Sequence, residues 1–152
     1  MESAAKATIH VGSIRIDFVV DADDSGGSVT IFECRVPADA KVPAPHSHDA
    51  FEETIYGLEG ACTWTIDGHI RELGPGDSAL IARGQIHGFE NHGDADAKFL
   101  AIASPGVFGP KYFAEIGEVL AASADGPPNP AAIGVVMRRH GLAPAPAVAA
   151  AR

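Results

Sequence analysis

Residues 45–60 read PHSHDAFEETIYGLEG, and this stretch predicts a metal site on β-strands. Alternate residues of an extended chain point to the same side, so His46 and His48 can present two imidazoles to one point. Four residues separate His48 from Glu53, which is enough for a short connection into a next strand whose carboxylate can reach that point. His87, further along the chain, offers a third imidazole. Three neutral imidazoles and one carboxylate suit a divalent first-row metal with positions left for water, dioxygen or substrate.

The chain around this stretch has the composition of short strands joined by tight turns. Apolar residues alternate with others in residues 13–20 and 28–36, as expected for half-buried strands. Asp67-Gly68 is a strong hairpin signal, because both residues can adopt positive φ. With no helical pattern between the strands, the sequence favours an antiparallel barrel or sandwich. The other predicted strands are residues 53–58, 61–67, 78–82, 85–89 and 98–104.

Helical spacing begins after residue 104. Pro110 can start a helix, since proline tolerates the first helical position, and the pattern predicts an amphipathic helix ending near Ala124. A second helix is predicted to start at Asn129-Pro130 and to end at Gly141. Residues 142–152 are rich in Ala and Pro without a periodic pattern, so we expect them to fray.

Length, charge and cysteine usage narrow the function classes. A chain of 152 residues is typical of one domain. Eleven Lys and Arg against 20 Asp and Glu give a net charge of −9, which disfavours nucleic acid and anionic membrane surfaces as partners. No apolar run approaches the roughly 20 residues needed to span a bilayer, and the N-terminus lacks the apolar core of a signal peptide. We therefore expect a soluble, cytoplasmic protein. Cys34 and Cys62 lie in strand-like segments and are predicted to be buried thiols.

The two histidine segments resemble the two motifs of the cupin family, specifically its small single-domain, quercetin-dioxygenase-like members. The first motif reads G, five residues, HxH, three or four residues, E, six residues, G, and the chain matches it from His46 to Gly60, with Ala40 in the place of the first glycine. The second reads G, five residues, PxG, two residues, H, three residues, N. The chain fits it from Gly76 to Asn91, with Ala82 in the place of the proline, a change in a turn rather than in a ligand.

The resemblance implies an all-β fold with C-terminal helices, in which the strands form a double-stranded β-helix, the jelly-roll barrel of cupins. The domain division that it implies is a barrel at 1–108 that contains motifs 45–60 and 76–91, helices at 109–141 packing on the barrel, and a tail at 142–152. Small cupins commonly pair through an outer sheet, so a homodimer is expected.

The resemblance also implies one divalent first-row metal (Fe, Mn, Ni, Cu or Zn) held by His46, His48, Glu53 and His87. Glu52 is left outside the ligand set, because the spacing of the motif to its last glycine selects Glu53. The implied function is that of a dioxygenase-type oxidoreductase acting on a small organic molecule, with Glu53 as the catalytic general base. A non-oxidative isomerase or lyase, and a ligand-binding protein without catalysis, are the alternatives.

Residues that lie an even number of positions from Glu53 or His87 in the same strand point to the same face of the sheet, and they are predicted to line the substrate pocket. These are Ile55, Gly57, Gln85 and Phe89. Trp64 is interpreted as a core residue and Tyr112 as a residue that docks the first helix, with substrate contact and closure of the cavity mouth as the alternatives. Of the other four histidines, His69 is expected to be exposed, and His10, His92 and His140 are expected to be surface or capping residues.

Overall fold

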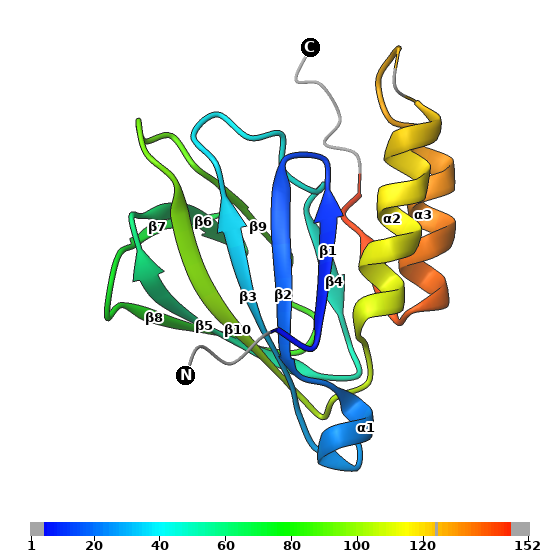
Figure 1. Cartoon of the computed structure of the whole chain (residues 1–152), viewed down its shortest axis with the longest axis horizontal. Coiled ribbons are helices and arrows are strands. Elements are labelled where there is room, and N and C mark those ends of the chain that lie inside the picture. The colour runs from blue at the N-terminus through cyan, green and yellow to red at the C-terminus, as the bar shows by residue number, and fades with distance from the viewer. Residues whose placement is uncertain (1–4, 124, 147–152) are drawn as a thin grey trace.

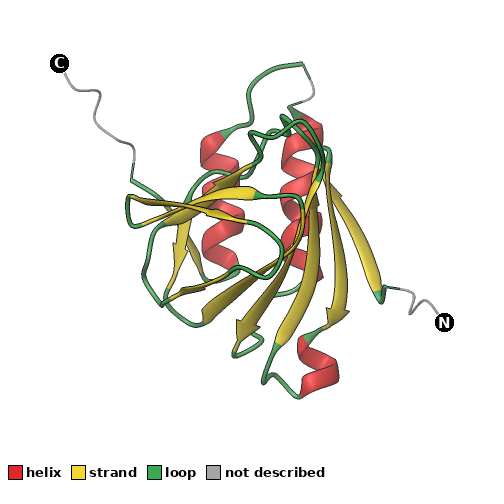
Figure 2. Cartoon of the chain, turned by 90° about the vertical axis from the view of Figure 1, so that its left-hand side faces the viewer, coloured by secondary structure: helices red, strands yellow, loops and turns green. Residues whose placement is uncertain are grey.

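The strands form two antiparallel sheets in the computed structural model, which describes residues 5–123 and 125–146 (Figure 1, Figure 2). In sheet order, the six-stranded sheet consists of β1 (Ala7–Val11), β2 (Ile14–Val20), β3 (Thr30–Val36), β10 (Ala97–Ser104), β5 (Glu52–Glu59) and β8 (Ser78–Ile81). The five-stranded sheet consists of β11 (Leu142–Pro144), β4 (His46–His48), β9 (His87–Glu90), β6 (Cys62–Ile66) and β7 (His69–Leu73). The expected strand-rich fold with C-terminal helices is confirmed.

Alternating burial along the strands places the core between the sheets. In β3, Phe32, Cys34 and Val36 are buried, and the residues between them face outward. Both cysteines are free and buried, as predicted. Burial raises the pKa of Cys62 to about 11 and the pKa of Cys34 well above its ordinary value, so both side chains remain thiols.

Turn chemistry sets the register of the hairpins. Asp67 and Gly68 have φ values of 46° and 77°, which are the positive angles that a two-residue turn between β6 and β7 requires. Gly12, with φ of 60°, joins β1 to β2. β1 was not among the predicted strands, although Ala7, Ile9 and Val11 alternate in it with the exposed Thr8 and His10.

Two helices cover one flank of the sheets. α2 (Pro110–Ala122) packs against β1, and α3 (Pro130–Arg139) packs against α2 (Figure 1). The side chain of Asn129 accepts hydrogen bonds from the first turn of α3, as expected for a helix cap. A further four-residue helix, α1 (Ala22–Ser25), connects β2 to β3. No helix in the described ranges combines the length and apolar character needed to cross a membrane.

The segment that we expected to fray contains β11. Leu142 is 3% exposed, and β11 pairs with β4 so that Leu142 lies opposite His48 and Pro144 opposite His46. The left-handed Gly141 (φ of 81°) turns the chain back from α3 to the edge of the sheet, where burial of Leu142 stabilises the pairing. Residues 147–152 of the predicted tail lie outside the described residues.

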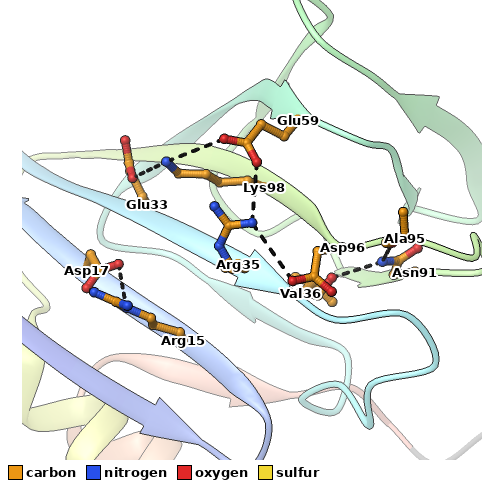
Figure 3. A network of polar contacts seen from close by, with 10 residues as sticks. All are labelled: Arg15, Asp17, Glu33, Arg35, Val36, Glu59, Asn91, Ala95, Asp96 and Lys98. Atoms are coloured by element: carbon orange, nitrogen blue, oxygen red, sulfur yellow. Dashed lines mark hydrogen bonds and ion pairs between the residues drawn. The ribbon is translucent and has the colours of Figure 1, made fainter.

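Ion pairs cross the outer face of the six-stranded sheet (Figure 3). The Lys98 Nζ lies 2.7 Å from Glu33 Oε2, and the Arg35 guanidinium lies 3.3 Å from Glu59. At the end of this network, the buried Asn91 amide donates 2.9 Å hydrogen bonds to the carbonyls of Val36 and Ala95 (Figure 3). The last residue of the second motif therefore ties the connection between β9 and β10 to β3.

Candidate metal centre

Three histidines converge from two neighbouring strands. His46 and His48 lie on β4, His87 begins β9, and His46 is paired with His87 across the two strands. The candidate ligand atoms of the three residues lie within 4.8 Å of one another. His48 and His87 are only 2% and 3% exposed, so the imidazoles meet inside the protein. This cluster could bind a metal ion.

Backbone carbonyls orient all three imidazoles. The Nδ1–H of each ring donates a hydrogen bond to a nearby main-chain oxygen, so the Nε2 lone pair is left for a ligand. The acceptors are the carbonyls of Ala44 (3.2 Å, from His46), Phe51 (2.9 Å, from His48) and Gln85 (2.9 Å, from His87). The HxH segment and the turn before His87 therefore preset the ring orientations.

Glu53 on β5 brings a carboxylate to the same point. Its Oε2 lies 3.1 Å from His48 Nε2 and 3.5 Å from His87 Nε2, although Glu53 is outside the set of atoms within 4.8 Å of one another. These distances are close to the separation of two ligands on one metal ion. Two ligand atoms that bind a metal at right angles, each about 2.1 Å from it, lie about 3.0 Å apart. His87 Nε2 is buried without a hydrogen-bond partner. The donor set therefore fits a divalent first-row metal.

Without a metal, protons link these groups. Burial alone would raise the pKa of Glu53, but the hydrogen bond with His48 and the nearby imidazole of His87 lower it well below its usual range. Burial lowers the pKa of His87, yet the contact with Glu53 outweighs it and the pKa of His87 is raised. The pKa of His46 falls to about 4, because the ring is desolvated and faces His87. His46 is therefore neutral, as a metal ligand must be.

A cavity of about 60 Å³ adjoins the cluster between the two sheets and α2. Phe89 lines it, together with Trp64 and Tyr112. Of the predicted pocket residues, Ile55, Gly57 and Gln85 do not line the cavity that the described residues enclose. Ile55 is fully buried in the core.

Close backbone contact explains the position of Gly57. A Cβ at this residue would lie 2.0 Å from the Gly74 carbonyl oxygen, and the Gly57 amide donates a 2.9 Å hydrogen bond to Asp77. The side of β5 on which Gly57 was predicted to line a pocket is therefore filled by the turn before β8. The alternation of residues along β5 did not reveal this contact, because the backbone of Gly74 that lies against Gly57 belongs to a distant segment of the chain.

Gln85 and Asp67 together hold the turn that precedes His87. The side-chain oxygen of Gln85 accepts a hydrogen bond from the Ala82 amide (2.8 Å), and its side-chain nitrogen donates one to the Asp67 carboxylate (3.3 Å). The Asp67 carboxylate also accepts a hydrogen bond from the Ile86 amide (2.9 Å), and the Asp67 main-chain amide donates one to the Ile86 carbonyl (2.8 Å). The sequence identified Asp67 as a hairpin residue, but nothing in its spacing revealed this second contact.

Removal of the Asp67 carboxylate is expected to weaken metal binding about tenfold, because supporting hydrogen bonds position a ligand histidine. Asp67→Gly tests this without backbone strain, since glycine tolerates the positive φ. Asp67→Asn, which retains a side-chain acceptor for Ile86, serves as the control. Zinc affinity is measured by competition with a chromophoric chelator. Equal affinities of Asp67→Gly and the wild type would show that the turn holds His87 without the carboxylate.

The remaining polar candidates lie outside the cluster. Glu52 pairs with Arg83 at 2.9 Å on the exposed side of β5. His10, His69 and His92 are exposed, as expected. His140 is the C-cap of α3, one of the two roles expected for it; its side chain is 14% exposed, and its Nε2 lies 2.9 Å from Glu115 Oε2 on α2. The helical pattern placed His140 at a helix end but did not show that the end packs on α2.

Comparison with known proteins supports the cupin resemblance. The cupin domain model matches residues 32–103. A cupin-superfamily sugar phosphate isomerase from Silicibacter pomeroyi is 26% identical, with a TM-score of 0.55 over 62% of this chain and 60% of that one. The match thus spans less than two thirds of the isomerase.

Two further structures show likeness in fold. A predicted oxalate decarboxylase from Thermotoga maritima has a TM-score of 0.58 at 21% identity, over 62% of this chain and 82% of its own. KdgF from Halomonas sp. has a TM-score of 0.57 at 22% identity, over 65% of this chain and 87% of its own. No curated protein matches the chain. The family model, the structural likeness and the histidine cluster agree: residues 32–103 of the chain match the cupin domain.

Proposed function

We propose that the protein is a metal-dependent dioxygenase acting on a small organic molecule, with one divalent first-row metal bound by His46, His48, Glu53 and His87. The observation that carries this proposal is the convergence of three imidazoles and one carboxylate at the wall of an apolar cavity. Such a metal, when bound, supplies Lewis acidity and, for a redox-active ion, the electron transfer on which dioxygen chemistry depends.

The chain's own residues serve the reaction by position and proton transfer. Glu53 is ionised, because the contact with His48 lowers its pKa, and its position at the cavity wall lets the carboxylate accept a proton from a substrate hydroxyl or an acidic carbon. The apolar walls exclude water and admit dioxygen, which is itself apolar. Both oxygen atoms enter the product, so the reaction requires no external reductant.

The charge of the cavity supports this function over reactions on phosphorylated sugars. None of the described residues that line it is Lys or Arg. A phosphate buried there would lose its hydration without gaining a cationic side chain as a partner, which is costly. We therefore place an isomerase or lyase reaction second, as an outcome of the experiment below.

Oxygen consumption tests the proposal. The protein is loaded separately with Fe(II), Mn(II), Ni(II), Cu(II) and Zn(II) and incubated with small diketones, phenols and thiols under ¹⁸O₂. We expect metal-dependent oxygen uptake and a product that contains two ¹⁸O atoms, with uptake lost in Glu53→Gln. A product formed equally without oxygen would replace the dioxygenase by an isomerase or lyase. Binding without any product would replace it by a ligand-binding protein.

We further infer that the two sheets are the halves of a double-stranded β-helix built by 1–108, followed by the helices of 109–141 and by a tail whose β11 returns to the second sheet. The path of the chain supports this, because it moves repeatedly between the sheets from β3 to β10. A crystal structure in which these strands do not alternate between the sheets would contradict the inference.

The outer face of the six-stranded sheet is proposed as a homodimer interface. Leu80 and Tyr56 are 61% and 43% exposed, and Leu80 lies in register with Thr54 and, beyond it, Ile102. The ion pairs of Figure 3 carry both signs on the same face, so a second copy would not be strongly repelled.

Leu80→Asp is expected to convert the dimer into a monomer, because it buries an unpaired charge at the interface. Light scattering after size-exclusion chromatography measures the mass, which should fall from twice 15.7 kDa to 15.7 kDa. Ile70→Asp, at a residue 73% exposed on the other sheet, should remain dimeric. A monomeric wild type, or equal dissociation of both variants, would exclude this interface.

A further inference from the structure

The cavity contains hydrogen-bonding groups that metal binding does not use. Among the described residues, three buried side-chain atoms have no hydrogen-bond partner: Thr30 Oγ1, Trp64 Nε1 and His87 Nε2. Trp64 and His87 both line the cavity. The proposed metal satisfies His87, so that Trp64 Nε1, which is buried in a residue that lines the cavity, is left without an acceptor.

The position of Trp64 places it beside the metal ligands. On β6, Trp64 pairs with Phe89, and Ile66 pairs with His87 two residues along. Alternation along the strands therefore gives Trp64 the same inward direction as His87. Trp64 is 2% exposed, and its indole N–H is a donor only. Because an unpaired buried donor is costly, a ligand with an acceptor oxygen gains binding energy there.

The rest of the wall restricts the ligand to a largely apolar molecule. Aromatic and aliphatic side chains come from both sheets and from α2, including Phe32, Phe99, Phe108 and Ile116. Tyr112 adds a hydroxyl from α2. Burial and the nearby charge of Glu53 raise the pKa of Tyr112, so this hydroxyl stays protonated and can donate. Apart from the cluster residues, no charged side chain in the described lining can pair with a ligand.

The volume of the cavity narrows the class of ligand further. A cavity of about 60 Å³ holds about four to six water-sized groups, whereas an engineered protein cavity that binds benzene measures about 150 Å³. Side chains from α2 and the segment before it, among them Phe108 and Tyr112, form one wall of the cavity. A bulky aromatic compound would have to displace this wall.

We propose that the cavity binds short-chain carbonyl compounds of about four to six non-hydrogen atoms, whose carbonyl oxygen accepts a hydrogen bond from Trp64 Nε1–H. This inference names the substrate class of the proposed enzyme and rests on that function only for turnover. Binding of the carbonyl group to Trp64 requires neither metal nor oxygen, so the two proposals can fail separately.

The single tryptophan makes the test direct, because Trp64 gives the one indole N–H resonance of the chain. Metal-free and zinc-loaded full-length ¹⁵N-labelled protein is titrated with 2-butanone. We expect a saturable downfield shift of the indole proton in both forms. Phenylacetone, which has the same acceptor on a larger body, and glucose 6-phosphate should shift it at least tenfold less at equal concentration.

Two variants separate the hydrogen bond from general packing. In calorimetric titrations, Trp64→Phe should bind 2-butanone about fivefold more weakly, the loss expected for one hydrogen bond. Tyr56→Phe, which removes an exposed hydroxyl outside the cavity, should bind it as the wild type does. An indole resonance that does not move, or one that phenylacetone or glucose 6-phosphate moves equally, would overturn the inference. Loss of zinc binding or of turnover with the shift intact would overturn only the proposed enzyme.

Discussion

His48→Ala is expected to reduce zinc affinity about 100-fold and to abolish metal-dependent oxygen uptake. A site with four protein ligands supplies about 10–16 kcal/mol, so one ligand contributes about 3 kcal/mol. His48 is also the imidazole nearest to Glu53, at 3.1 Å, and its loss separates the carboxylate from the cluster. Zinc affinity is measured by chelator competition, and bound metal by elemental analysis.

His92→Ala is the matched control for this experiment. The His92 side chain is 65% exposed and pairs only with Glu90, at 2.8 Å among the described contacts. We expect wild-type metal content and affinity. If His48→Ala retained full zinc affinity while its circular dichroism remained native, the cluster would not be a metal site.

Phe51→Ala is expected to lower the free energy of unfolding by about 3–5 kcal/mol, the usual cost of emptying a fully buried phenylalanine site. Phe51 has no exposed surface. Its ring stacks on His48 at 3.9 Å and on Phe108 at 5.0 Å between centroids. The substitution therefore removes a contact to the cluster and one to the segment before α2. Urea unfolding followed by circular dichroism measures the loss.

Val135→Ala on α3 provides the comparison, because Val135 is 49% exposed. Its effect should stay within about 0.5 kcal/mol. Zinc affinity of Phe51→Ala should also fall, since the Phe51 carbonyl and ring both orient His48. A variant that loses stability but binds zinc as tightly as the wild type would show that the carbonyl alone orients the ring.

Much of the fold and of the histidine cluster could be predicted because both depend on local patterns. Alternation identifies strands such as β3, and the angles of Asp67-Gly68 follow from residue type. The convergence of His46 and His48 follows from period two along a strand. The partnership with His87 required the family resemblance, since nothing local shows that β4 and β9 are neighbours.

The parts that sequence did not reveal depend on distant contacts. Gly57 faces the backbone of Gly74, and Gln85 faces Asp67 rather than a ligand. β11 is too short to show a period, and its place is set by pairing with β4. Strand parity gives the side of a sheet toward which a residue points, but not what lies on that side.

The pairing of β4 with β11 has a consequence for biosynthesis. His46 and His48 are translated early, whereas their neighbours in the sheet, residues 142–144, leave the ribosome only after everything between them. Closing so long a loop is slow compared with forming the hairpins, because distant segments must meet. We expect the nascent chain to acquire its hairpins during translation and its metal-binding competence only after residue 144 has emerged.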